Sequence, residues 1–279
     1  MLGYDMKRFI TRLFLYLFVI VYACIIIYPI YLMFITSLKE NREIFSNPYG
    51  LPKVLTFSGY EKLFRISDYA TYFKNSILTT LVSIAFIIVF ASPVAYVLAK
   101  YKFRGNKLIY LYFIIGLVVP IKLGTISILQ MMIGLGLYNH IISLIVVFVA
   151  MGLPFGVFIL TDFIRMIPEE LSNSARIDGC SEPVIFSRII MPLLKPAVAT
   201  VAIVNFIPVW NDFWFPLILI ESDSMKTVPL ATALLFGQFE TNYGLVFSAL
   251  SVASLPVIVF YLITARHFVK GITAGGLKG

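Results

Sequence analysis

The sequence is poor in charge, histidine, cysteine and tryptophan. Only 13% of its 279 residues are charged, and it holds two histidines, two cysteines and two tryptophans. A soluble domain carries about 25% charged residues, so the composition excludes a soluble enzyme and a secreted disulfide scaffold. Cys24 and Cys180 lie far apart in the sequence. Neither a disulfide framework nor a metal site follows from these few side chains.

The sequence also lacks a catalytic constellation. It has no phosphate-binding loop of the form Gly-x-x-x-x-Gly-Lys-Ser/Thr, so we expect the chain itself not to hydrolyse ATP and to bind no cofactor. His140 and His267 are isolated, each at the end of an apolar stretch. The chain is therefore predicted not to be an enzyme.

Apolar residues, in contrast, are abundant and grouped. They make up 60% of the chain and gather in blocks of the roughly 20 residues that cross a hydrocarbon layer about 30 Å thick. The N-terminal block has no small-x-small cleavage site after it, and we interpret it as a retained anchor. We predict an all-α polytopic membrane protein with six transmembrane helices, at about 13–35, 76–99, 108–133, 141–160, 197–220 and 245–264.

Some of these spans are not expected to be straight. Pro29, Pro93, Pro154 and Pro256 lie in or near spans and predict kinks. The stretch from 108 to 137 is too long for one straight crossing, and it carries Gly116, Pro120 and Gly124. We expect it to bend or break there.

The basic residues indicate an orientation. The net charge is +8, but lysine and arginine flank the apolar blocks and form no continuous patch, so no nucleic-acid partner is expected. With both termini inside, the inner segments 1–12, 100–107, 162–195 and 266–279 hold 14 basic residues, against 7 in the outer segments. This bias places both termini in the cytoplasm.

Two connecting loops are longer than ordinary connectors. The outer segment 38–74 is either a solvated linker or a small surface for an external partner. The inner loop 162–195 has a helical pattern, because Pro168 can open a helix and Glu169 and Glu170 suit the positive end of its dipole. Leu171, Ser174, Ala175 and Asp178 then share one small, mildly apolar face of this helix.

Gly179 follows that helix at the position where a helix end favours a left-handed residue. Ser181 can cap a second helix, which carries apolar residues as far as Pro192. The loop is thus predicted to be two short amphipathic helices that meet at a glycine elbow. Short helices need a groove to lie in, either on their own membrane domain or on a cytoplasmic protein.

This loop resembles the EAA loop of ABC importer permeases. The pattern is Glu169-Glu-Leu-x-x-x-Ala175-Arg-Ile-Asp-Gly179, followed by Phe186, Ile189 and Pro192. Trp210-Asn-Asp-Phe213 is similar to a signature of the carbohydrate-uptake, maltose-type branch of that family, and the ending Phe268–Gly279 is close to its usual C-terminus. Gly134–Asn139 and Pro154-Phe-Gly156 also match in order, so the resemblance covers the whole chain.

The resemblance implies a fold, a function and partners. The fold is the type I ABC importer permease fold, a single transmembrane domain over 1–279 that contains the coupling loop 162–195. The function is binding-protein-dependent import of a carbohydrate, such as an oligosaccharide, across the bacterial cytoplasmic membrane. The implied partners are a second homologous permease, two copies of a cytoplasmic ATPase that use ATP and Mg²⁺, and an external solute-binding protein.

The residues implied in ATPase docking are Glu169, Glu170, Asn173, Ser174, Ala175, Asp178 and Gly179. The sequence departs from the family at two of them. Asn173 replaces the usual glutamate and Ser174 the first alanine, which removes a charged contact there but leaves docking itself possible. Glu169 or Glu170 could replace that charge.

A small set of polar residues lies within the predicted spans. Lys122 and Asp212 are about 22 Å and 24 Å from the inner ends of their spans, so they could pair and line a path. Alternatively, Lys122 extends to the outer interface and Asp212 caps a helix break near Pro216. Asn205, Trp210 and Asn211 could offer amide and aromatic surfaces to a sugar, although Trp210 also suits an interfacial aromatic belt.

Three other functions remain open at this point. A self-contained secondary transporter would need ion-coupling carboxylates inside the membrane, and Asp212 is the candidate in these spans. A membrane scaffold would have no use for the polar residues in the third and fifth spans. A permease for a solute other than a sugar would keep the same loop.

Overall fold

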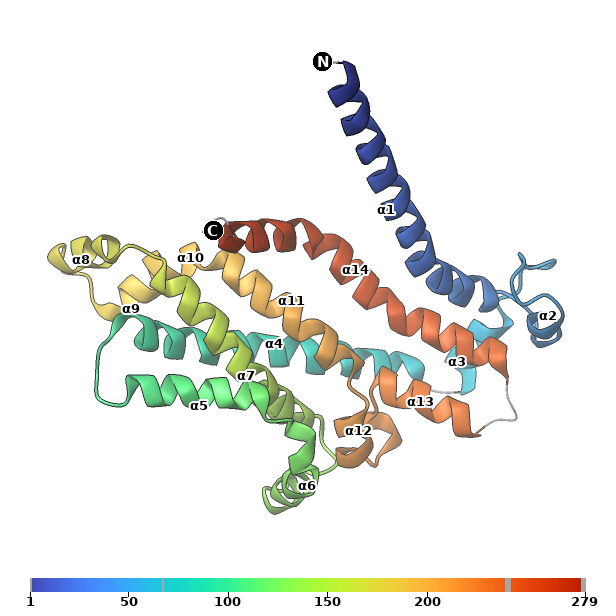
Figure 1. Cartoon of the computed structure of the whole chain (residues 1–279). Coiled ribbons are helices and arrows are strands. Elements are labelled where there is room, and N and C mark those ends of the chain that lie inside the picture. The colour runs from blue at the N-terminus through green and yellow to red at the C-terminus, as the bar shows by residue number, and fades with distance from the viewer. Residues whose placement is uncertain (1, 67, 239–241, 277–279) are drawn as a thin grey trace. The chain divides into compact units, whose positions relative to one another are not determined.

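The computed structural model describes residues 2–66, 68–238 and 242–276, with side chains for 8–65, 68–235 and 242–264. Within these ranges every regular element is helical (Figure 1), which confirms the all-α prediction. The ending Phe268–Gly279 lies outside the described side chains. The helices are α1 Leu2–Thr36, α2 Asn41–Ser46, α3 Ser58–Ile66, α4 Tyr69–Lys100, α5 Asn106–Val118, η1 Ile121–Gly124, α6 Thr125–Gly134, α7 Ile141–Arg165, α8 Glu169–Ile177, α9 Glu182–Ile185, η2 Phe186–Ile190, α10 Met191–Leu193, α11 Lys195–Asn211, α12 Trp214–Leu219, η3 Asp223–Met225, α13 Val228–Gln238 and α14 Tyr243–Gly276.

Four helices within the described residues are long and apolar enough to cross a membrane, and two bent pairs raise the possible number of spans to six. The four are parts of α1, α4, α7 and α14. In the first bent pair, α5 and the segment Ile121–Gly134 meet at 86°. This confirms the bend expected from Gly116, Pro120 and Gly124.

The fifth predicted span needs a correction. A single helix over 197–220 is wrong, because α11 ends at Asn211 and α12 starts only at Trp214. The pattern of apolar residues continues through this break, so hydropathy alone did not reveal it. Pro29, Pro93, Pro154 and Pro256, by comparison, lie inside helices that continue past them.

The first compact unit consists of residues 1–68 and 234–254. Here the segment after α1 is folded rather than a solvated linker. Lys39 is buried and its Nζ donates to the carbonyl oxygen of Asn47 at 2.7 Å. Asn41 Oδ1 accepts from the Gly244 amide at 2.9 Å, and a Cβ on Gly59 would lie 2.5 Å from the Gly244 oxygen. The segment containing α2 and α3 therefore packs closely on the start of α14.

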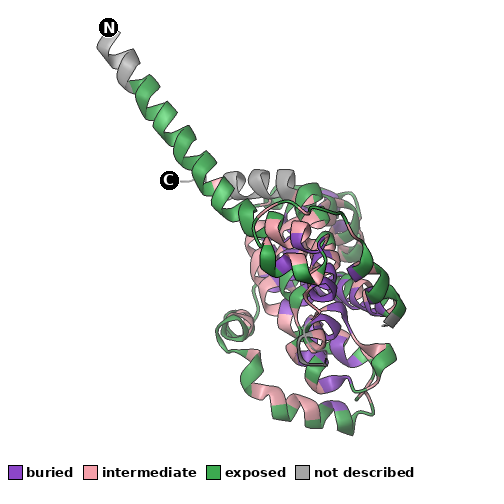
Figure 2. Ribbon diagram, turned by 90° about the vertical axis from the view of Figure 1, so that its right-hand side faces the viewer, coloured by how far each residue is buried: buried purple, intermediate pink, exposed green. Residues whose placement is uncertain are grey.

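Helix α1 has a different environment within this unit. Its apolar window is 0% buried, its large side chains are exposed, and its described residues are mostly coloured as exposed (Figure 2). Such a helix is hydrophobic on every face and cannot be stable in water, so it needs lipid or a partner around it.

The second unit consists of residues 69–233 and 255–279. Helices α4, α5, α7 and α11 lie side by side in it (Figure 1). Helix α7 approaches its neighbours closely at Gly152 and Gly156: a Cβ on Gly156 would lie 2.9 Å from that of Ala91. Small residues at such positions let helix backbones approach each other in the membrane.

Two apolar clusters stabilise the two ends of this unit. One contains Ala91, Leu160 and Ile164, and it continues into the loop 162–195 through Ala175 and Ile185. The other packs α6, α7 and α12 together at the opposite end. The first cluster fixes the loop to the helix bundle, which gives the loop a defined position.

Candidate functional site

The loop 162–195, which we call the docking loop, contains the two predicted short helices. Helix α8 follows Pro168 and carries the exposed Glu169 and Glu170 in its first turn. The second helical segment runs from Glu182 to Leu193 and includes a π-helical turn at Phe186–Ile190. Ser181 stands at its N-cap position, but its side chain makes no capping hydrogen bond.

The elbow between the helices has the predicted left-handed geometry. Gly179 has φ +81°, the Cys180 amide donates to the Ala175 oxygen at 2.9 Å, and the Gly179 amide donates to the Arg176 oxygen at 3.0 Å. These two bonds define a Schellman motif, which satisfies the last carbonyls of a helix. Apart from Gly179 and its two chain neighbours, no atom of the described residues lies within 4 Å of where a Cβ on Gly179 would be. Glycine is therefore required by the left-handed backbone conformation and not by a lack of space for a side chain.

A polar cluster fixes the angle of the elbow. Arg176 Nε donates to Glu182 Oε1 at 2.6 Å, and its Nη1 donates to Asn173 Oδ1 at 2.7 Å. The other Glu182 oxygen accepts from the Tyr96 hydroxyl of α4 at 2.8 Å. Bonds from Arg176 and then from Tyr101 lower the pKa of Glu182 to about 2, so this carboxylate stays ionised at any physiological pH. This cluster could not be predicted from local patterns, because Tyr96 and Glu182 are distant in the chain.

The predicted face of α8, Leu171, Ser174, Ala175 and Asp178, is exposed except at Ala175. Ala175 is predicted in the docking face, but it is buried in the chain's own apolar cluster; nearby Ser172 is buried as well. Leu171 of the predicted face is 45% exposed, and Ile177, outside that face, is 86% exposed. The remaining predicted docking residues are exposed, namely Glu169, Glu170, Asn173, Ser174, Asp178 and Gly179.

Lys122 and Asp212 do not form an ion pair among the described residues. Asp212 Oδ1 instead accepts from the Phe215 amide at 2.9 Å and caps the start of α12, as the alternative interpretation predicts. Lys122 Nζ lies 6.0 Å from the centre of the Trp214 ring, within range of a cation–π contact.

The three other polar candidates are dispersed rather than gathered on one path. Asn205 is buried and its Nδ2 donates to the Val201 oxygen at 2.8 Å. Trp210 is 2% exposed and packs against the Phe73 and Phe206 rings, so it offers no face to a passing sugar here. Asn211 is exposed. Of the five predicted path residues, Lys122 and Asn211 are exposed and Asp212 is half-buried, whereas Asn205 and Trp210 are buried.

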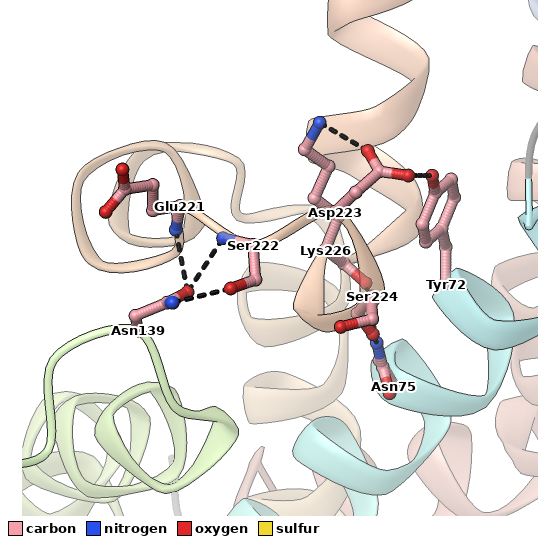
Figure 3. A network of polar contacts seen from close by, with 8 residues as sticks. All are labelled: Tyr72, Asn75, Asn139, Glu221, Ser222, Asp223, Ser224 and Lys226. Atoms are coloured by element: carbon pink, nitrogen blue, oxygen red, sulfur yellow. Dashed lines mark hydrogen bonds and ion pairs between the residues drawn. The ribbon is translucent and has the colours of Figure 1, made fainter.

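At the end of this unit opposite the docking loop, a polar cluster holds the connector 220–227 (Figure 3). Asn139 has φ +58°; its Oδ1 accepts from the Glu221 and Ser222 amides at 3.0 and 2.8 Å. The same connector is held to α4, because Asp223 accepts from the Tyr72 hydroxyl at 2.6 Å and Asn75 donates to the Ser224 oxygen. The connector is thus fixed from two sides.

The long apolar helices and the exposed rigid elbow define a class. They describe a multi-pass membrane protein with an exposed two-helix loop at one end of its helix bundle. The chain belongs to the family described as binding-protein-dependent transport system inner membrane component, whose model matches residues 91–274. It is therefore a transport permease of that family.

Two described relatives match this chain over almost its full length. The chain is 33% identical to a putative ABC transporter permease protein, ORF2, of Caldicellulosiruptor sp. strain Rt8B.4, covering 96% of this chain and 98% of that protein. It is 32% identical to the arabinooligosaccharides transport system permease protein AraQ of Bacillus subtilis strain 168, over 100% of both. The same fold occurs in a bacterial ABC transporter involved in the import of alginate, with a TM-score of 0.82, 20% identity and coverage of 93% and 96%.

Proposed function

We propose that this chain is one permease subunit of an ABC importer that takes up an oligosaccharide delivered by an external binding protein. The observation that carries the proposal is the preformed elbow at Gly179 on a family permease chain. The substrate class is supported by relatives named for arabinooligosaccharides, for starch degradation products and for melibiose, raffinose and stachyose.

The proposed mechanism is alternating access driven by separate ATPase subunits. These subunits, and not the permease chain, bind ATP and Mg²⁺. Their closure moves α8 through its exposed residues Leu171 and Ile177. The motion passes to the membrane helices because Ala175 and Ile185 belong to the same apolar cluster as α4 and α7. Such rigid-body coupling of helices is a general route for opening one side of a transporter and closing the other.

A self-contained secondary transporter is less well supported. Such a transporter needs ionisable groups inside the membrane that bind and release the coupling ion. Asp212 already accepts the Phe215 amide as a helix cap. An exposed two-helix elbow also has no evident use in a transporter that works alone.

Reconstitution tests the function. The complex purified through this chain is placed in proteoliposomes and supplied with its binding protein and labelled oligosaccharides. We expect the ATPase and a second permease to co-purify, and uptake to require both ATP and the binding protein. Uptake driven by an ion gradient, without the ATPase, would refute the proposal. ATP-dependent uptake of a solute other than a sugar would refute the substrate class alone.

The proposed orientation has both termini and the docking loop in the cytoplasm. Lys53 and Arg104 are exposed in the segment after α2 and in the α4–α5 connector. In a background with Cys24 and Cys180 replaced by serine, Lys53→Cys should react with an impermeant maleimide added to intact cells. Arg104→Cys should react only after permeabilisation. The reverse pattern would overturn the orientation.

A further inference from the structure

The connector between α4 and α5 adjoins a basic pocket of about 380 Å³. Lys102, Lys107 and Arg165 line it. Arg165 is partly neutralised, because it lies 3.2 Å from Asp162 and packs over the Tyr110 ring. Lys102 and Lys107 have neither a hydrogen bond nor an ion pair to any residue that the structure describes. The pocket therefore keeps an excess of positive charge.

The start of α5 adds to this excess. Gly105 precedes the helix without a side-chain cap, and Lys107 lies in the first turn, which holds no acidic residue. A lysine at the positive end of a helix dipole is unfavourable by itself. An anion in the pocket would neutralise the positive charge of the lysines and would accept hydrogen bonds from the uncapped amides at the start of α5.

An apolar groove of about 610 Å³ is lined by the same connector. Its walls come from the end of α4, the connector, and the start of the second docking-loop helix: Pro93, Val97, Tyr101, Phe103, Pro183 and Phe186. Glu182 at its edge is already paired with Arg176. The groove continues along α4 into an exposed apolar stripe that includes Phe86 and Phe90, whose rings stack at 5.6 Å.

We propose that the pocket and the groove together bind one anionic phospholipid. Its phosphate lies among Lys102, Lys107 and Arg165, and an acyl chain lies in the groove and along the stripe on α4. Both hollows share Tyr101, Lys102 and Phe103, so one amphipathic molecule can occupy both. Basic clusters beside a membrane helix are a common way to recognise anionic lipid. An acidic protein surface would match the lysines but leave the groove and the stripe uncovered.

Native mass spectrometry of the purified complex, stripped of lipid and then titrated, tests this site. We expect dioleoylphosphatidylglycerol to be retained and dioleoylphosphatidylcholine to be lost. The double variant Lys102→Ala/Lys107→Ala should weaken retention about 30-fold, because each basic residue contributes roughly fivefold. The matched control Lys53→Ala/Lys62→Ala removes two exposed lysines elsewhere and should leave retention unchanged.

Three outcomes would overturn the proposal. Equal weakening in the control pair would mean that net charge, not this site, attracts the lipid. Complete displacement of the lipid by inorganic phosphate would identify a free-phosphate site. Unchanged lipid retention with loss of the ATPase from the complex would identify a protein-docking surface. The lipid titration does not involve the transported solute. A negative result would therefore contradict the lipid site and would not contradict the proposed import function.

Discussion

Replacing Gly152 with valine is expected to prevent the second unit from folding stably. A Cβ at this position would lie 2.3 Å from Ile87 Cδ1 on α4 and 2.5 Å from Asn205 Oδ1 on α11. Valine adds two methyl groups beyond that atom, so two helices must shift. Overpacking of a tight interface typically costs about 1–3 kcal/mol. Displacing Asn205 also threatens its buried hydrogen bond to Val201, worth a further ~1 kcal/mol.

A graded series measures this effect. Gly152→Ala should lower the melting temperature of the detergent-solubilised protein, and Gly152→Val should abolish recovery of monodisperse protein. Gly134 is the matched control, because it also lies in a helix but has no atom within 4 Å of its Cβ position. Gly134→Ala and Gly134→Val should therefore be recovered normally. If both glycines tolerate valine equally, α4, α7 and α11 do not pack as described.

The membrane architecture could be predicted because each span depends only on a continuous run of apolar residues, which is a local property of the sequence. A span needs about 20 apolar residues in sequence, so each of the six blocks was visible without any knowledge of its neighbours. The bend near Pro120 and the left-handed Gly179 were also predictable, since proline and glycine restrict or permit backbone angles locally. The break at Asp212 was predicted only as one of two alternatives, because the apolar run continues on both sides of it and hydropathy does not reveal where α11 ends.

Helix phase and long-range contacts explain what could not be predicted in the site. The periodicity of α8 leaves open whether Ala175 packs on the chain itself or on a partner, and the resemblance implies ATPase docking there. In the structure Ala175 belongs to the apolar cluster of α4 and α7. The residue type of Trp210 suits either a sugar contact or an interfacial aromatic belt, whereas its burial depends on its contact with Phe73 of α4. The link from Glu182 to Tyr96 likewise joins residues whose proximity only the fold determines.

Replacing Gly179 with valine is expected to separate transport from ATP hydrolysis while leaving the membrane helices intact. At φ +81° a residue with a Cβ costs about 1–2 kcal/mol, and more if it is β-branched. The chain can relieve this strain by giving up the two Schellman bonds and rotating α8. A penalty of about 1–2 kcal/mol lowers the population of the docked elbow by a factor of about 5–30. Uptake should fall accordingly.

The measurement pairs recovery of the ATPase, by affinity purification through this chain, with uptake and ATP turnover in proteoliposomes. Gly179→Asn should retain most activity, because asparagine tolerates left-handed angles. Gly136 has φ +68° and open space around its Cβ position, as Gly179 has, but it lies outside the docking loop. Gly136→Val therefore imposes the same kind of strain elsewhere and should keep the ATPase bound.

The comparison between the two valine variants decides what the elbow does. If only Gly179→Val loses the ATPase or its coupling, the angle between α8 and the second helix is what transmits ATP-driven closure. Equal losses in both variants would trace the defect to general strain in the fold. Normal uptake with normal ATPase retention in Gly179→Val would show that the docking loop is not the coupling element, since its geometry would then be dispensable.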